Sequence, residues 1–146
     1  MRLLVQRSKN SKVTVDNKIT GQIDFGLVVL VGFKTDDTYK DIEYLVKKLI
    51  NLRIFDDENG VMNKSLLDVN GSVLSISQFT LYANTKKGNR PSYFYSMNAT
   101  EASKLYDIFN EELRKYVKVE TGIFQAEMQV SITNDGPVTI LLESEG

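Results

Sequence analysis

The 146-residue chain contains no cysteine and no histidine. The absence of cysteine excludes disulfides and thiolate chemistry and is typical of a reducing compartment. The absence of histidine excludes Ser-His-Asp and Cys-His pairs, and without either residue nearly all ordinary zinc sites are excluded. It also removes the side chain most used for proton transfer near neutral pH. An enzyme of this composition would rely on hydroxyls, amides, carboxylates, backbone N–H groups or a group on the substrate.

A long apolar run and a large net charge are also lacking. No run approaches the ~20 residues needed to span a bilayer, and residues 1–8 have neither the apolar segment nor the cleavage site of a signal peptide. We therefore expect a cytoplasmic protein with no membrane partner. The formal net charge of −1 does not indicate a strongly basic nucleic-acid binder, and we expect no DNA partner, although a local basic patch is compatible with it.

The composition and the hydrophobic pattern indicate one folded domain. The chain is 42% hydrophobic and 25% charged, as in ordinary globular proteins. Apolar residues at 42, 45, 46, 49 and 50 predict a helix face, preceded by a capping box of Thr38 and Asp41. A second helix is predicted over residues 99–117, with Asn98 as its cap and Glu101 at the capping-box position.

The remaining apolar segments are short and predict strands. They lie at residues 2–7, 13–15, 26–33, 53–55, 72–82, 117–121, 128–133 and 138–143, with a two-residue hairpin turn at Asp16-Asn17. Residues 65–70 are expected to be irregular. Many short strands with two main helices favour a single α+β domain, residues 1–146, with a largely antiparallel, barrel-like sheet.

Residues 75–80, S-I-S-Q-F-T, place four polar side chains at the end of an apolar run. In a strand, Gln78 and Thr80 would share one face and Ser77 would take the other. These groups either satisfy neighbouring backbone and water, or form a small pocket in which free backbone N–H groups act as an oxyanion hole. Because no histidine is present to activate a hydroxyl, the second interpretation favours stabilisation and positioning over covalent catalysis.

Three other motifs are open to a functional and a plain structural interpretation. Residues 134–137, N-D-G-P, have the composition of a turn between two strands, and such an X-Pro bond is cis in only ~5–6% of cases. Residues 86–90, K-K-G-N-R, would either hold phosphates beside a pocket or form a solvated loop. Residues 56–58, D-D-E, indicate a turn without the regular spacing of metal ligands, so we expect no metal site.

S-Q-F-T at residues 77–80 and N-D-G-P-V-T at residues 134–139 resemble the D-aminoacyl-tRNA deacylase family, also called D-tyrosyl-tRNA deacylases. Further matches run from end to end of the chain: V-Q-R at 5–7, N-L-R-I-F at 51–55, S-L-L-D-V at 65–69, K-G-N-R-P-S at 87–92, V-E-T-G at 119–122 and M-Q-V-S at 128–131. The chain departs from the family pattern at Gln125, where many members have glycine, and at residues 93–98, where a Pro-containing linker is commoner.

The resemblance implies an esterase that needs no cofactor. It would cleave the bond between a D-amino acid, or glycine mischarged on alanine tRNA, and the 3′-terminal adenosine of tRNA. It implies a homodimer with active sites at the interface, where a cis peptide matching Gly136-Pro137 enters the partner's site. The carbonyls of this Gly-Pro peptide would leave no room for the side chain of an L-amino acid, which would give chiral proofreading by exclusion.

The resemblance also implies a role for individual residues. The implied catalytic residues are Ser77, Gln78, Phe79 and Thr80, and the implied substrate-binding residues are Arg7, Phe124, Met128, Gly136 and Pro137. Backbone N–H groups of Phe79 and Thr80 would lie near the scissile carbonyl, Phe124 and Met128 would hold the adenine, and Arg7 would brace the Gly-Pro loop.

Two questions stay open at the level of the sequence. Thr80 is the nucleophile in one view, while in the other the terminal 2′-OH activates water; the absence of histidine favours the second. Two alternatives from other classes also remain: a non-catalytic module that binds RNA ends or a small ligand, and a dimeric structural protein.

Overall fold

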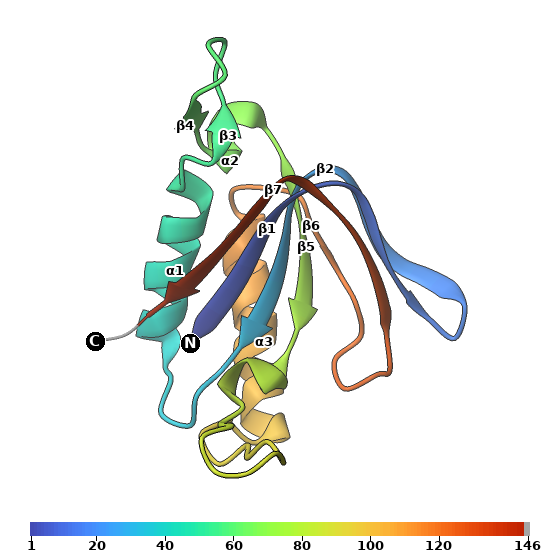
Figure 1. Ribbon diagram of the computed structural model, residues 1–146, viewed down its shortest axis with the longest axis vertical. Helices are drawn as coiled ribbons and strands as arrows, with labels where there is room; N and C mark the ends of the chain where they lie inside the picture. Colours follow the sequence, from blue (N-terminus) through green and yellow to red (C-terminus); the bar gives the residue numbers. More distant parts are fainter. Residues whose placement is uncertain (145–146) are drawn as a thin grey trace.

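The computed structural model describes residues 1–144, so the last two residues of the predicted domain 1–146 lie outside the described part. One five-stranded sheet carries the two long helices, α1 and α3, on the same face (Figure 1). The elements are β1 (Arg2–Val15), β2 (Lys18–Gly32), α1 (Tyr39–Asn51), β3 (Phe55–Asp56), β4 (Met62–Lys64), α2 (Leu66–Val69), β5 (Ser72–Ser77), the 3₁₀ helix η1 (Phe79–Tyr82), α3 (Ala99–Arg114), β6 (Val119–Thr121) and β7 (Gln129–Glu143).

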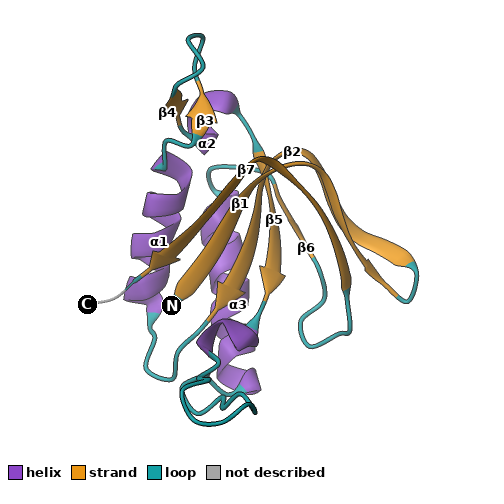
Figure 2. Cartoon of the chain, viewed as in Figure 1, coloured by secondary structure: helices purple, strands orange, loops and turns teal. Residues whose placement is uncertain are grey.

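The sheet has the order β6-β5-β2-β1-β7, and β3 and β4 form a small separate hairpin (Figure 2). β1 is antiparallel to both β2 and β7, whereas β5 is parallel to β2 and to β6. The α+β class is therefore confirmed, with the antiparallel pairing carried by the three long strands. The sheet is open, because β6 and β7 form its two edges. The expected barrel-like sheet is therefore a curved sheet that does not close.

Alternation along β2 divides the core between the two faces of the sheet. Leu27, Val29 and Val31 face the helices and belong to the main cluster, as the period of two requires. Val28 belongs to a second cluster on the other face, covered by Val13 of β1 and by Ile23, Leu74, Ile76 and partly buried residues of β7. The far halves of the long strands therefore bend over the sheet and cover the face that has no helix.

The helix caps and the first hairpin turn are confirmed. Thr38 and Asp41 form a reciprocal capping box at the start of α1, and the side chain of Asn98 accepts the N–H of Glu101 at the start of α3. Asp16 and Asn17 have φ values of 50° and 63°, which is the backbone of a tight two-residue hairpin turn.

Two predicted strand boundaries are wrong, and both concern the candidate site. The predicted strand over residues 72–82 ends at Ser77, and the chain then closes into η1 through i→i+3 bonds such as Leu81 N–H to the Gln78 carbonyl, at 3.2 Å. Gln78 and Thr80 therefore do not share a strand face. The two predicted strands 128–133 and 138–143 are one strand, β7, because both halves pair with β1.

The other differences are small and have local causes. Residues 66–69 form the short helix α2, held by a capping box of Ser65 and Asp68, where irregular structure was expected. The backbone and side-chain bonds of Ser65 hold the pKa of Asp68 below its ordinary value. The strands expected at 2–7 and 13–15 are one strand, β1, the strand expected at 53–55 lies at Phe55–Asp56, and the second helix ends at Arg114.

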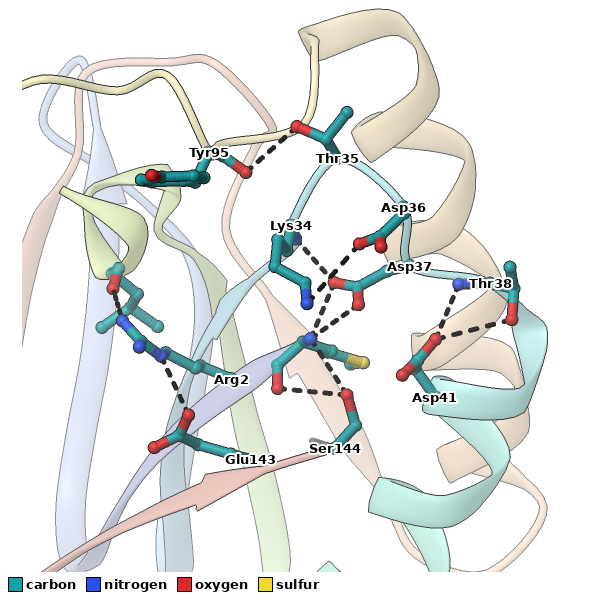
Figure 3. A network of polar contacts seen from close by, with 12 residues as sticks. Arg2, Lys34, Thr35, Asp36, Asp37, Thr38, Asp41, Tyr95, Glu143 and Ser144 are labelled. Atoms are coloured by element: carbon teal, nitrogen blue, oxygen red, sulfur yellow. Dashed lines mark hydrogen bonds and ion pairs between the residues drawn. The ribbon is translucent and has the colours of Figure 1, made fainter. Parts of the chain in front are cut away.

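A polar network joins the start of β1, the end of β7 and the turn before α1 (Figure 3). The α-amino group of Met1 lies 2.8 and 2.7 Å from the two carboxylate oxygens of Asp37 and 3.0 Å from the Ser144 hydroxyl. The side chains of the ion pair are 0% and 3% exposed. Among the described residues, no helix is long and apolar enough to cross a membrane.

Candidate active site

A pocket of about 540 Å³ opens where β2 and β5 end, between η1, the start of α3 and the loop from β6 to β7. Its walls consist of Val31, Phe33, Ile76, Ser77, Gln78, Phe79, Met97, Ala99, Ala102, Phe124, Gln125, Ala126, Met128 and Val130. None of these side chains is ionisable. The pocket therefore offers apolar surface, two polar side chains on its strand wall and a third, Gln125, on its loop wall, with no acid or base of its own.

Of the four residues proposed as catalytic from the sequence, Ser77, Gln78 and Phe79 line the pocket, whereas Thr80 is not among the lining residues. The N–H of Gln78 donates to the Val31 carbonyl at 2.7 Å, which holds the end of β5 against β2. The Gln78 amide also donates to the Thr80 hydroxyl. In the described residues this hydroxyl therefore contacts an amide, and no carboxylate or amine that would act as a base.

Two backbone donors open η1 without partners. The N–H groups of Phe79 and Thr80 have no acceptor within residues 1–144, because the first N–H groups of a helix have no carbonyl inside that helix. The carbonyl of Phe79 accepts the Ser96 hydroxyl at 3.1 Å, and its ring packs edge-on against Tyr93 with 4.9 Å between centroids. These contacts fix the first turn of η1, of which Phe79 lines the pocket and Thr80 does not.

The opposite wall comes from the loop between β6 and β7, which carries Phe124 and Met128. The Phe124 ring lies 5.9 Å from the ring of Tyr106 on α3, whose hydroxyl donates to the Ser75 carbonyl at 2.8 Å. Burial raises the pKa of Tyr106, so this donor stays protonated. Gln125 has a φ of 66°, a conformation that favours glycine.

Gly136 and Pro137 lie in a different place, on a bulge of β7. Gln6 pairs with Thr139 and Ser8 pairs with Asn134, so residues 135–138 loop out of the strand opposite one residue, Arg7. The Gly136-Pro137 peptide bond is cis, as the resemblance implied. Both residues are exposed. The motif is therefore an excursion from a continuous strand, and the alternative of a turn between two strands is wrong.

Arg7 holds this bulge from the β1 side. Its Nε donates to the Asp135 carbonyl at 2.9 Å, and its Nη1 donates to the Ile54 carbonyl at 2.9 Å. On the other side, the N–H of Val138 donates to the side chain of Asn134 at 2.8 Å. The structure thus places Arg7 against the Gly-Pro bulge and away from the pocket, whose lining does not include it.

The bulge and the pocket of one chain are far apart. Through the pairings of β1 with β2 and of β2 with β5, Arg7 is level with Val73, four residues before Ser77. Four residues along a strand and three strand spacings between β7 and β5 place the two features on the order of 20 Å apart. The Gly-Pro bulge therefore does not reach the pocket of its own chain.

The start of α3 forms a wall that the sequence analysis did not find. Met97, Ala99 and Ala102 line the pocket there, but alanine at the start of an amphipathic helix looks like ordinary core packing. Of the acidic residues 56–58, Asp56 ends strand β3 and is not part of the expected turn, whereas the turn follows it: the Asp57 carboxylate accepts the N–H groups of Asn59 and Val61. No group of metal-binding side chains occurs within residues 1–144.

The fold and the pocket define a small α+β protein with a pocket between a strand end and a loop that no ionisable side chain lines. The family model for D-Tyr-tRNA(Tyr) deacylase matches residues 4–143 of the chain. Two relatives named D-aminoacyl-tRNA deacylase, from Bacillus cytotoxicus and Bacillus cereus, are each 56% identical over 146 residues, which cover 99% of this chain and all of each relative.

Two solved structures are similar to the chain in fold. One, described as c-Myc DNA Unwinding Element Binding Protein, has a TM-score of 0.95 and 42% identity with complete coverage of both chains. Another, of a probable eukaryotic D-amino acid tRNA deacylase, has a TM-score of 0.84 at 18% identity, covers 97% of this chain and 98% of its own, and shows the shared fold. The chain belongs to the D-Tyr-tRNA(Tyr) deacylase family.

Proposed function

We propose that the chain hydrolyses the ester of D-aminoacyl-tRNA, and of glycine mischarged on alanine tRNA, and releases the free amino acid and tRNA. As a member of the deacylase family, the chain is an ester hydrolase. The observation that carries the proposal is a pocket lined by no ionisable side chain, with the unpartnered backbone N–H of Phe79 in its wall and that of Thr80 on the next residue of η1.

In this proposal the two N–H groups act as an oxyanion hole, which their lack of an acceptor within residues 1–144 supports. Water adds to the ester carbonyl carbon, and the carbonyl oxygen gains negative charge that the Phe79 and Thr80 N–H groups stabilise. The bond to the ribose 3′ oxygen then breaks, and that oxygen takes a proton. Because no lining side chain is a base, the neighbouring 2′-OH of the substrate is the group that orients and activates the water.

Phe124 and Met128 supply the apolar wall for the terminal adenine. An aromatic ring supported from behind by Tyr106 provides a flat surface on which a base stacks. Gln125 replaces the usual glycine of the family at a positive φ and narrows the rim of the same wall. The Ser77 and Gln78 side chains lie across the pocket from it and bind polar atoms of the aminoacyl ester.

The chirality filter is proposed to come from a second copy of the chain. A bulge that lies on the order of 20 Å from its own pocket serves the pocket of a partner in a homodimer. There the Gly136-Pro137 backbone occupies the space that the side chain of an L-amino acid would need. The side chain of a D-amino acid points away from this backbone, and glycine has no side chain to exclude. Arg7 keeps the bulge in shape through its bond to the Asp135 carbonyl.

This function requires no cofactor or metal, and its substrate places the protein in the cytoplasm, where tRNA is used. That DNA is not a partner remains a prediction. One similar solved structure is named as a protein that binds a DNA unwinding element, so a DNA competitor is a useful control in binding assays.

The test is deacylation of D-Tyr-tRNA and L-Tyr-tRNA by the purified protein at equal charge and concentration. We expect rapid loss of the D-ester while the L-ester is spared. Turnover of neither ester, with measurable binding of the tRNA end, would contradict the proposal and favour the non-catalytic binding module.

A further inference from the structure

The surface next to the pocket is free of acidic residues over a long stretch of chain. The chain has 19 acidic residues, yet residues 69–100 contain none and carry Lys86, Lys87 and Arg90. All three cations are exposed. Within residues 1–144, none of them forms an ion pair. A local positive charge therefore lies on a chain whose formal net charge is −1.

A second hollow of about 330 Å³ lies beside this stretch. We call it the basic hollow; it is lined by Arg2, Lys34, Tyr82, Ala83, Asn84, Thr85, Lys86, Tyr95 and Glu143. Three of these residues are cationic and one is anionic. An oligonucleotide phosphate is the common ligand of such a combination of cations and aromatic rings.

Arg2, which lines this hollow, has partners on several sides of its guanidinium, two of which are drawn in Figure 3. It donates to the Leu81 carbonyl at 2.7 Å, lies 4.5 Å from the centre of the Tyr82 ring and approaches Glu143 at 3.4 Å. Lys34 lies 3.5 Å from Asp36. Lys86 has no acidic neighbour within ion-pair distance in the described residues, so it is the cation best placed to bind an added anion.

The basic hollow adjoins the candidate active site. η1 lies between them: its first residue, Phe79, lines the pocket, and its last, Tyr82, lines the basic hollow. The segment before α3 repeats this arrangement, because Met97 lines the pocket and Tyr95 lines the basic hollow. A strand of RNA that leaves the pocket over η1 therefore enters the basic hollow directly.

We infer that the basic hollow binds the single-stranded RNA that precedes the terminal adenosine of the substrate, with Lys86 on a phosphate and Tyr95 stacked on a base. The inference rests on the proposed function for the identity of the RNA. Tyr95 is 50% exposed and its neighbour Phe94 is 81% exposed, and exposed rings beside cations are the usual platform for unpaired bases.

The direct test is binding of a short labelled RNA ending in C-C-A, followed by fluorescence anisotropy at several salt concentrations. Lys86→Ala is expected to weaken binding and to lower the salt slope by about one, as for the loss of one phosphate contact. Tyr95→Ala is expected to weaken binding about tenfold through lost stacking. Lys47→Ala and Tyr44→Ala, at exposed positions on α1, are matched controls expected to bind as the wild type does.

A second readout separates the basic hollow from the catalytic pocket. Lys86→Ala and Tyr95→Ala should raise KM for D-Tyr-tRNA, while the hydrolysis of D-tyrosyl-adenosine, which lacks the preceding nucleotides, keeps the wild-type rate. Equal loss on both substrates, or RNA binding unchanged in both variants, would overturn the inference. If the wild type hydrolyses neither substrate, the proposed function fails, and the RNA-binding comparison still decides this inference.

The oligomeric state tests whether the basic hollow is instead a contact surface between two copies of the chain. Light scattering of both variants should give the same mass as the wild type. A change from dimer to monomer with RNA binding unaltered would show that the basic hollow is a contact between copies of the chain, and would overturn its assignment to RNA.

Discussion

Single residues show how this pocket can act without the usual catalytic side chains. The first two residues of η1, Phe79 and Thr80, have backbone N–H groups with no acceptor within the described residues. The Thr80 hydroxyl is bonded to the Gln78 amide, and within residues 1–144 it contacts no carboxylate or amine. In the proposed mechanism this hydroxyl has a supporting role and is not the nucleophile, because it lacks the base that would activate it.

Thr80→Ala is therefore expected to keep substantial deacylase activity, because the substitution leaves the backbone N–H of residue 80 in place. We expect kcat to fall by less than about tenfold, as for the loss of a supporting hydrogen bond. The measurement is single-turnover hydrolysis of D-Tyr-tRNA. Complete loss of turnover with tRNA binding intact would identify Thr80 as the nucleophile.

Some residues that line the pocket can be predicted from the sequence and others cannot. Ser77 and Gln78 stand out because polar side chains end an apolar run, and the structure places both in the pocket wall. Ala99 and Ala102 line the same pocket but carry no chemical signal. Their role depends on where α3 begins relative to β5, and that is a property of tertiary packing.

Among the elements, the starts of α1 and α3 were predictable from local capping chemistry, whereas the short helix α2 and the strand ends set by pairing were not. The capping box of Thr38 and Asp41 fixes the start of α1, and its two partners are only three positions apart in the sequence. The end of β5 depends on whether residues 78–82 find a neighbouring strand, and they close into η1 instead. β7 continues past N-D-G-P because β1 is long enough to pair with both halves.

The Met1–Asp37 pair holds three elements together and gives a prediction at this scale. Asp37→Asn should lower the free energy of unfolding by about 3–5 kcal/mol, because it leaves a buried ammonium group without its counter-ion. The adjacent Asp36→Asn is a matched control: its side chain is 81% exposed, and the expected change is below about 1 kcal/mol. Urea unfolding followed by circular dichroism measures both, and equal effects would contradict this account of the network.

At the scale of the whole molecule, the proposed function needs two copies of the chain. The pocket lies at the end of β2 and β5, and the Gly-Pro bulge lies on the far edge strand β7. The resemblance to the family rests on both motifs and implied that they meet between two copies, and the strand pairing shows that they are separated within one chain. Catalysis and chiral selection would thus be supplied by different copies.

Gly136→Ala is expected to damage chiral selection more than catalysis. Gly136 has a φ of +134°, and an added Cβ would lie 3.0 Å from Nη2 of Arg7, so the bulge would have to move. The ratio of kcat/KM for D-Tyr-tRNA over L-Tyr-tRNA should fall by about tenfold or more. Gly60→Ala, also at a positive φ of +73° but with no atom within 4 Å, should keep the wild-type ratio. An unchanged ratio in Gly136→Ala would contradict selection by exclusion at this bulge.

The central claim is that the substrate supplies the reactive group that the pocket lacks. The most direct test is single-turnover hydrolysis of D-Tyr-tRNA whose terminal adenosine lacks the 2′-OH and carries the amino acid on the 3′ oxygen. The account predicts that this substrate binds as the normal one does but is hydrolysed at least about a hundredfold more slowly, as expected for the loss of a positioned catalytic group. Hydrolysis at the normal rate would contradict the account and would place the activating group on the protein.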